Sequence, residues 1–373
     1  MNSTNTEDVK ANKNCLLVFR NKKLNNFDDN LSVISEFSKA GYYFDKISYI
    51  AYDNANDIVR AVWDGKDNYE NLVIICPSDM EYTLKHFLSK IFASEFDELG
   101  ILKTGIFHIF ILFSDKENKL KVEDISKILN KKYGIGYEKA FIKTVGAPSK
   151  LIGDAIAEAL DGQDAEEVRK LINFNVSEKF GDCTIEIVYS DKTPKSLFDS
   201  VFRSLLKNLE EYVYSVDDFT LAERLFQILQ LRRMKIGVAE SFTGGGISKR
   251  LVEIAGISEV YTEGLNVYSN EAKKMRLGVK EETLRMYGAV SEQTAYEMAQ
   301  GLINGGLCDV SIATTGIAGP KSDLSSKPVG LVYLSVGTKD DVAVYKYNLK
   351  GDRKSITETA INLALFHTFK ILK

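Results

Sequence analysis

The chain has 373 residues, of which 45% are hydrophobic and 27% are charged, and its formal net charge is -4. This length predicts two or three domains, because one hydrophobic core rarely serves more than about 300 residues. The mild negative charge, without any Lys/Arg block, excludes a nucleic-acid-binding protein that works through its overall electrostatic field.

Residues 1–14 are polar and lack the apolar core of a signal peptide. The longest apolar run, near 106–113, is far shorter than a membrane span. The four cysteines are scattered and form no Cys-x-x-Cys pair. We therefore expect a cytoplasmic protein with free thiols, no membrane association, no metal site and no cofactor.

The first part of the chain reads as three strand–helix pairs between residues 15 and 92. Apolar strands are expected at 16–19, 47–51 and 72–76, and helices at 30–40 and 56–63. This alternation predicts an open α/β domain, which would bind a ligand at the carboxyl ends of its strands.

The segment best placed for such a ligand is Cys76-Pro77-Ser78-Asp79-Met80. It has no glycine that would let a phosphate approach the backbone, and no cluster of carboxylates for a metal. We therefore predict that this domain is a scaffold, or a site that has lost its chemistry.

The pattern of apolar and polar residues changes near residue 136, and the next segment is predicted to form a strand, a helix, a strand and a helix in turn. These elements are expected at 140–145, 148–160, 184–189 and 195–209. The order resembles that of a KH module, which binds nucleic acid through a basic Gly-x-x-Gly loop. No such loop is present in this segment, so nucleic-acid binding is not expected.

A polar start near residue 217 and a helix at 221–231 open the last domain. A strand at 235–239 then runs into Glu240-Ser241-Phe242-Thr243-Gly244-Gly245-Gly246, and an amphipathic run follows at 247–254. A strand that turns into a helix through Ser, Thr and Gly presents hydroxyls and backbone N–H groups at one point. α/β proteins build sites for nucleophiles and anions in this way, although the sequence also fits an ordinary capped turn.

Three further polar turns follow strand-like runs in this domain. In the first, Ser269 is a good helix N-cap and places Lys273 one turn into the helix. Lys273 is either a solvated helix lysine or an ammonium group whose pKa is lowered by burial, so that it can act as a base. In the other two, Thr315 offers a hydroxyl and Arg353 either binds a phosphate or carboxylate or decorates a helix cap.

Histidine is rare: the chain contains only His86, His108 and His367, and none lies in a polar or Gly-rich motif. A Ser–His triad is therefore poorly supported, and a hydrolytic Ser241 would need another base.

Six motifs in the last domain resemble the successive motifs of the CinA family (competence/damage-inducible proteins), and more specifically of its C-terminal amidohydrolase domain. They are Ala239-Glu240-Ser241-Phe242-Thr243-Gly244-Gly245, Tyr268-Ser269-Asn270-Glu271-Ala272-Lys273, Gly288-Ala289-Val290-Ser291, Thr315-Gly316-Ile317-Ala318-Gly319-Pro320, Lys327-Pro328-Val329-Gly330 and Gly351-Asp352-Arg353. The family usually has Cys where this chain has Phe242, which we interpret as a change in the wall of the pocket.

The resemblance implies an α/β fold class with three domains. These are an open α/β sheet domain of the molybdopterin-binding type (1–136), a small KH-like α+β module (137–216) and the α/β amidohydrolase domain (217–373). In the family, the first domain has a Gly-Gly-Leu-Gly-Pro-Thr loop and is associated with metal-dependent ADP-ribose pyrophosphatase activity. Residues 76–80 replace that loop here, so the domain is degenerate and we do not expect the activity.

The resemblance also implies the reaction: hydrolysis of the carboxamide of nicotinamide mononucleotide to nicotinate mononucleotide and ammonia, without a metal. Ser241 is then the nucleophile and Lys273 its base, with Tyr268 orienting Lys273 or relaying the proton. The remaining implied site residues bind the oxyanion or position the substrate: Thr243, Gly244 and Gly245 through backbone N–H groups, then Thr315 and Arg353, with Ser258 as a weaker candidate. Family members are commonly dimeric, so a homodimer is expected.

Two alternatives stay open. The first is a non-catalytic protein that binds or senses nucleotides, which the degenerate first domain and Phe242 favour. Retention of Ser241, Tyr268 and Lys273 together argues against it. The second is ADP-ribose hydrolysis by the N-terminal domain.

Overall fold

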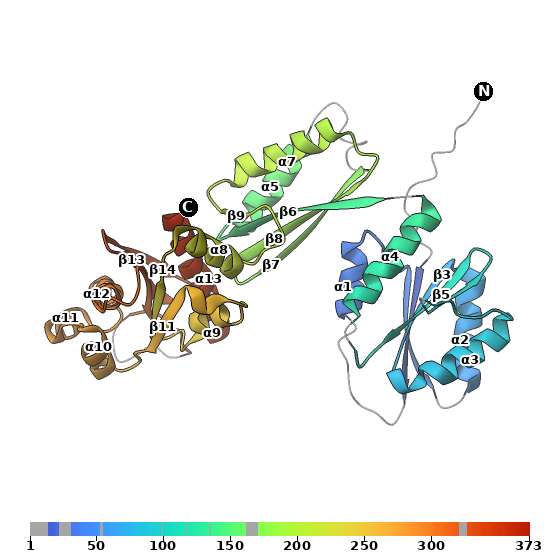
Figure 1. Cartoon of the computed structure of the whole chain (residues 1–373), viewed down its shortest axis with the longest axis horizontal. Coiled ribbons are helices and arrows are strands. Elements are labelled where there is room, and N and C mark those ends of the chain that lie inside the picture. The colour runs from blue at the N-terminus through green and yellow to red at the C-terminus, as the bar shows by residue number, and fades with distance from the viewer. Residues whose placement is uncertain are drawn as a thin grey trace. The chain divides into compact units, whose positions relative to one another are not determined.

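The computed structural model describes residues 14–21, 31–52, 55–98, 100–116, 118–134, 136–161, 171–320 and 327–373. The described residues form three β-sheets flanked by helices (Figure 1), which confirms the predicted α/β class. Most of the polar N-terminal segment, residues 1–13, and residue 30, where we predicted a helix to begin, lie outside the described residues.

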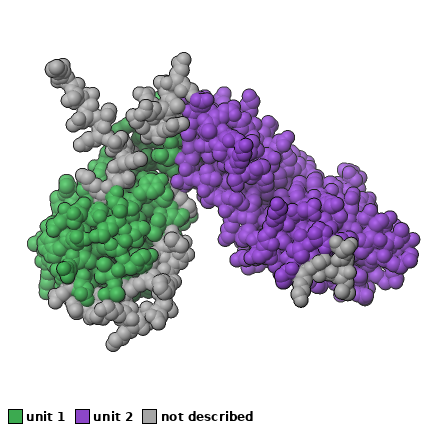
Figure 2. All heavy atoms as spheres, turned by 180° about the vertical axis from the view of Figure 1, so that it is seen from behind, with its two compact units in different colours: residues 1–139, 164–173, 187–195 green, residues 140–163, 174–186, 196–373 purple. Residues whose placement is uncertain are grey.

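The chain divides into two compact units (Figure 2). The first consists of residues 1–139, 164–173 and 187–195, and the second of residues 140–163, 174–186 and 196–373. The residues predicted to form the site, from Ser241 to Arg353, all belong to the second unit.

The N-terminal sheet has the strand order β2-β1-β3-β5-β4. Its strands are β1 (Asn14–Asn21), β2 (Lys46–Tyr52), β3 (Asn71–Cys76), β4 (Ile101–Thr104) and β5 (Phe107–Phe113). All pair in parallel except β4, which is antiparallel to β5 at the edge. Its helices are α1 (Leu31–Lys39), α2 (Ala55–Asn68), α3 (Glu81–Phe92) and α4 (Lys119–Tyr133), with a short 3₁₀ turn η1 (Ser78–Met80).

Both faces of this sheet are covered, because successive strand residues point to opposite sides. Leu17 and Ile74 pack in one core cluster with α2 and α3. Leu16 and Val73 pack in a second cluster with α1 and α4. This two-sided burial explains why the strands are apolar throughout and do not alternate with polar residues.

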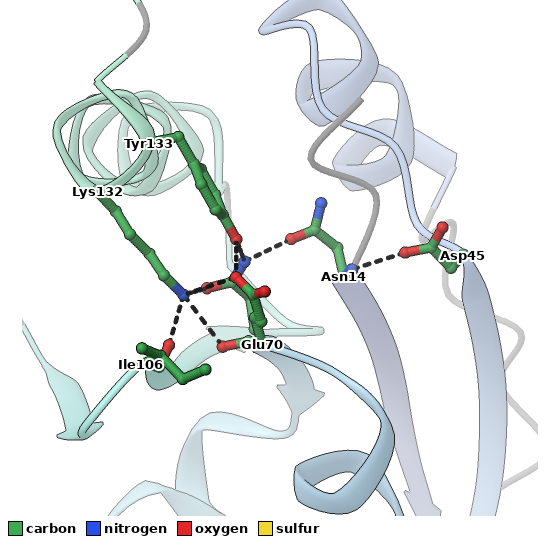
Figure 3. A network of polar contacts seen from close by, with 7 residues as sticks. Asn14, Asp45, Glu70, Ile106, Lys132 and Tyr133 are labelled. Carbon is green, nitrogen blue, oxygen red and sulfur yellow. Dashed lines mark hydrogen bonds and ion pairs between the residues drawn. The ribbon is translucent and has the colours of Figure 1, made fainter. Parts of the chain in front are cut away.

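A buried polar network closes the amino-terminal end of this sheet (Figure 3). Asn71 is 0% exposed, and its Nδ2 donates to Asn14 Oδ1 and to the Tyr133 hydroxyl, each over 2.8 Å. Lys132 Nζ donates to Asn71 Oδ1 over 2.9 Å, and the Asn14 N–H donates to Asp45 over 2.8 Å. These bonds tie α4 to the starts of β1 and β3.

Residues 76–80, the segment best placed for a ligand, lie at the opposite end of β3, and there the carboxylate of Asp115 accepts the available hydrogen bonds. The backbone N–H of Ser78 donates to Asp115 Oδ1 over 3.0 Å, and its hydroxyl donates to Asp115 Oδ2. The donors that follow the most apolar strand are therefore taken by a carboxylate of the same domain.

The middle sheet has the order β7-β8-β6-β9. Its elements are β6 (Tyr137–Val145), α5 (Ser149–Ala159), β7 (Ile172–Lys179), β8 (Asp182–Ser190), α7 (Lys195–Leu209) and β9 (Val213–Ser215). Both predicted helices and both predicted strands are present. Strands β7 and β9 were not predicted.

The C-terminal sheet has the order β11-β10-β12-β13-β14. Its strands are β10 (Ile236–Glu240), β11 (Tyr261–Asn266), β12 (Val310–Gly316), β13 (Leu331–Thr338) and β14 (Val342–Asn348). Strand β10 pairs in parallel with β11 and β12, whereas β13 and β14 are antiparallel. The helices are α8 (Leu221–Arg232), α9 (Gly246–Val252), α10 (Asn270–Leu277), α11 (Glu281–Tyr287), α12 (Glu292–Asn304) and α13 (Arg353–Leu372), with a 3₁₀ turn η2 (Ile257–Glu259).

This sheet also has two buried faces. Val238 of β10 packs with residues of α8, α9 and α13, while its neighbour Ala239 packs with residues of α10, α11 and α12 (Figure 1). His367 of α13 stacks on Tyr345 at 3.6 Å between ring centroids, and burial lowers its pKa to about 4. His367 is therefore a neutral, half-buried residue that packs against β14. Within the described ranges, no helix is both long and apolar enough to cross a membrane.

Candidate active site

The carboxyl ends of β10, β11 and β12 meet at one edge of the C-terminal sheet, because these neighbouring strands are parallel. Ser241 directly follows β10, Tyr268 lies two residues after β11, and Thr315 lies at the end of β12. The topology thus brings three of the predicted motifs to the same edge.

Ser241 and Lys273 form a buried pair at this edge. Ser269 caps α10 by accepting a hydrogen bond from the Ala272 N–H over 3.0 Å, which starts the helix and orients its first turn toward the strand ends. The Lys273 side chain is 0% exposed. Its Nζ lies 3.1 Å from Ser241 Oγ, 2.7 Å from the Val267 carbonyl oxygen and 3.1 Å from the Tyr268 carbonyl oxygen.

These three partners determine what a neutral Lys273 does. Burial lowers the pKa of Lys273 to about 8, because a desolvated ammonium group is unfavourable. A neutral amine has two N–H donors and one lone pair. Since the carbonyl oxygens of Val267 and Tyr268 can only accept, they take the two N–H groups. The lone pair is then left for the hydroxyl proton of Ser241, as a general base requires.

The backbone around Ser241 is held by β12. The Ser241 N–H donates to the Thr314 carbonyl oxygen over 3.1 Å, and the hydroxyls of Thr243 and Thr314 are 2.7 Å apart. Ser241 is 9% exposed, so it lies just below the surface. The turn predicted to carry the nucleophile (the nucleophile turn, residues 241–245) is thus hydrogen-bonded to the neighbouring strand on both sides of Phe242.

Two glycines of the nucleophile turn are required by its backbone. Gly244 and Gly245 have φ values of +62° and +92°, a region that other residues rarely adopt. At Gly245 a Cβ would also lie 3.2 Å from Asn266 Nδ2. The glycines therefore permit the sharp turn from β10 into α9.

Glu240 has a role that sequence reasoning missed. It is 1% exposed, and its Oε2 accepts from the N–H groups of Gly245 (3.0 Å) and Ile247 (3.1 Å). Its Oε1 accepts from the Ser248 N–H (2.9 Å) and the Ser248 hydroxyl (2.7 Å). A glutamate that ends an otherwise apolar strand, four residues before the first glycine of the turn, was the available signal.

These hydrogen bonds leave fewer backbone N–H groups free to bind an oxyanion than the sequence predicted. Two of the three N–H groups proposed for that role have partners within the chain. The Gly245 N–H donates to Glu240, and the Gly244 N–H donates to the Ser241 carbonyl oxygen over 3.2 Å.

The predicted position of the Phe242 side chain is wrong. We interpreted it as a residue of the pocket wall, but its side chain is buried in the core cluster that includes residues of α8 and α13. The aromatic ring therefore contributes to packing on the far side of the turn.

Tyr268 contributes to the pair through its backbone. Its carbonyl oxygen accepts from Lys273 Nζ, while its side chain is 70% exposed. Among the described residues the Tyr268 hydroxyl forms no hydrogen bond with Lys273 or Ser241, so the contact with Lys273 is made by the backbone alone.

The remaining predicted site residues are Thr315, Arg353 and Ser258, and each has its own surroundings in the structure. Thr315 is buried, and its hydroxyl donates to the Ala289 carbonyl oxygen over 2.7 Å, which holds the loop before α12. Arg353 begins α13, and its Nη1 donates to the Gly319 carbonyl oxygen over 2.8 Å. Ser258 is exposed in η2, before β11, and so lies near the amino end of that strand, away from Ser241.

Among the described residues, no group of three or more His, Cys, Asp or Glu side chains is arranged to hold a metal ion.

Fold and site together define an α/β domain with a buried serine–lysine pair at the carboxyl edge of its parallel strands. Residues 218–372 match the model of the CinA C-terminal domain. The C-terminal domain of this chain therefore belongs to the CinA family, which confirms the family predicted from its motifs.

Curated relatives support this assignment. A CinA-like protein of Fusobacterium nucleatum is 44% identical over 174 residues, which are 46% of this chain and 42% of that protein. A CinA-like protein of Kosmotoga olearia is 36% identical over 227 residues, 60% of this chain and 54% of that protein. The chain thus spans about half the length of the curated relatives it matches. The solved structure of competence/damage inducible protein CihA from Agrobacterium tumefaciens is 37% identical, with a TM-score of 0.40, and the match covers 41% of this chain and 94% of that one.

Proposed function

We propose that residues 217–373 hydrolyse the carboxamide of nicotinamide mononucleotide to nicotinate mononucleotide and ammonia, through a covalent serine–lysine mechanism. The observation that carries the chemistry is the distance of 3.1 Å between the buried Lys273 Nζ and Ser241 Oγ. The choice of substrate is the one that the motif resemblance implies, and the match of residues 218–372 to the CinA C-terminal domain supports it.

The first half of the reaction forms an acyl-enzyme. Neutral Lys273 accepts the Ser241 proton while Oγ attacks the carboxamide carbon, so a C–O bond forms and the carbonyl oxygen becomes an oxyanion. When the tetrahedral intermediate collapses, the C–N bond breaks. The Lys273 ammonium returns its proton to the leaving nitrogen, which departs as ammonia.

The second half regenerates the enzyme. Lys273, neutral again, takes a proton from water as the water attacks the acyl carbon, and then returns that proton to Ser241 Oγ. The products are nicotinate mononucleotide and free Ser241. Lys273 thus acts as base and acid in each half, which a lysine can do near neutral pH only when its pKa is lowered.

Arg353 is proposed to bind the substrate phosphate. It is exposed, and the bond from Nη1 to Gly319 orients the guanidinium while the group keeps further N–H donors. Thr315 is proposed to act indirectly, because its hydroxyl holds the loop at Ala289.

The decisive experiment is an ammonia assay with the full chain and nicotinamide mononucleotide, run with EDTA and with added divalent metal. We expect ammonia and nicotinate mononucleotide in equal amounts at the same rate in both conditions. Binding of the nucleotide without ammonia release would instead establish the non-catalytic alternative. ADP-ribose, incubated in parallel with metal, is expected to stay intact, and its hydrolysis would assign an activity to the N-terminal domain.

A further inference from the structure

Glu240 carries an inference that rests on the proposed function and concerns how the oxyanion is stabilised. Its buried carboxylate has four hydrogen-bond donors around it, all from the first residues of α9 and the glycine before them. It forms no ion pair with any residue that the structure describes. Burying a carboxylate costs free energy unless hydrogen bonds compensate, and here the four bonds that compensate also fix the turn to the start of α9.

The donors that Glu240 uses are the ones a helix start normally offers to an anion. The N–H groups of Gly245, Ile247 and Ser248 donate to its carboxylate, and the Gly246 N–H donates to the Thr243 carbonyl oxygen over 3.0 Å. The protein's own negative charge therefore occupies the start of α9. Neither the oxyanion nor the substrate phosphate can bind there.

What remains in the nucleophile turn is two backbone donors. The N–H groups of Ser241 and Gly244 are paired, as described above. Those of Phe242 and Thr243 have no hydrogen-bond partner among the described residues. Their side chains point elsewhere: Phe242 into the core, and Thr243 to the hydroxyl of Thr314. The side chains of both residues are thus held by neighbouring elements, and neither side chain pairs with these N–H groups.

We infer that Glu240 is a positioning residue that locks the nucleophile turn, so that the N–H groups of Phe242 and Thr243 serve as the oxyanion donors. The donor next to a nucleophilic serine is well placed to reach the oxygen of the carbonyl that the serine attacks. Donors fixed before the reaction stabilise the oxyanion without reorganisation. The carboxylate acts from behind the turn and never touches the substrate.

The test is Glu240→Gln, which keeps the size of the side chain but turns one acceptor into a donor facing N–H groups. We expect kcat for nicotinamide mononucleotide to fall about 10²-fold, with KM and the pH at half-maximal rate unchanged. The matched control is Glu253→Gln, an exposed glutamate just after the end of the same helix, which should keep wild-type kcat. An unchanged kcat in Glu240→Gln, or an equal rise in KM, would overturn the inference.

A second probe separates this inference from the proposed substrate. Pyridine-3-boronic acid has a trigonal boron that takes Ser241 Oγ as a fourth ligand while the serine proton passes to Lys273. Its boron-bound oxygen then occupies the oxyanion position. We expect wild type to bind it at least about tenfold more tightly than Glu240→Gln. Equal affinity would refute the role of Glu240, whether or not nicotinamide mononucleotide is the substrate.

If Glu240→Gln does not fold, Glu240→Asp replaces it. Aspartate keeps the charge but is one methylene shorter, so it cannot reach the donors of residues 245 and 248 together. We expect kcat to fall about tenfold or more with unchanged KM, and wild-type kcat would contradict the inference.

Discussion

Replacing Ser241 with alanine is expected to reduce turnover of nicotinamide mononucleotide by about 10³-fold or more. The reason is that the hydroxyl is the only group at this position able to form the acyl-enzyme. The variant should still bind the nucleotide, because the substitution removes one oxygen from a nearly buried position. Turnover is measured as ammonia release, and binding by calorimetry.

Ser258→Ala is the matched control. It removes the same group from an exposed serine near the amino end of β11, and we expect turnover to stay at the wild-type level. Substantial turnover in Ser241→Ala would refute the nucleophile, and a lost nucleotide affinity would show that the substitution disturbs the pocket instead.

The second large effect concerns Lys273 and pH. Burial lowers its pKa to about 8, and only the neutral amine accepts the Ser241 proton. The rate should therefore be near its maximum above pH 8 and fall about tenfold for each pH unit below it. Lys273→Met and Lys273→Arg should both lose about 10³-fold or more, because arginine keeps the charge but cannot become neutral.

The neighbouring lysine gives the control for this series. Lys274 pairs with Glu281 at the surface over 2.9 Å, and Lys274→Met should keep both the wild-type rate and its pH profile. A rate that stays flat between about pH 6 and pH 9, or activity in Lys273→Arg, would exclude Lys273 as the base.

The sequence predicted the strand ends, the turn and the helix start of the site well, because each of these is specified by a short local pattern of residues. Apolar strands that end abruptly at Ser, Thr and Gly mark the turn after β10, and a serine cap four residues before a lysine sets the first turn of α10. Parallel pairing of β10 and β11 then brings Ser241 and Lys273 together. The shortage of histidine made the lysine the natural candidate for the base.

The features that the sequence did not reveal are the directions of side chains and the contacts between residues distant in the chain. Whether Phe242 faces the pocket or the core depends on one backbone rotation within the turn, and nothing in the local pattern specifies it. Tyr268 acts through its carbonyl oxygen, which every residue has, so its identity carries no signal. Strand β7 was missed because it is largely polar and exposed, and it is stabilised by pairing in the middle sheet.

The burial of Lys273 also has a thermodynamic consequence. In the unfolded chain its pKa is near 10.5, whereas in the folded domain it is about 8. Below pH 8 both states carry the proton, and the folded state bears the cost of a desolvated charge. Between about pH 8 and pH 10.5, unfolding takes up a proton, so stability rises with pH.

Relative to Lys273→Met, wild type should therefore gain about 3 kcal/mol of unfolding free energy over this range. Denaturant unfolding of the two proteins at several pH values measures this gain, and a constant difference between them would contradict it. Protonation of this one amine thus both stops the proposed reaction and weakens the fold.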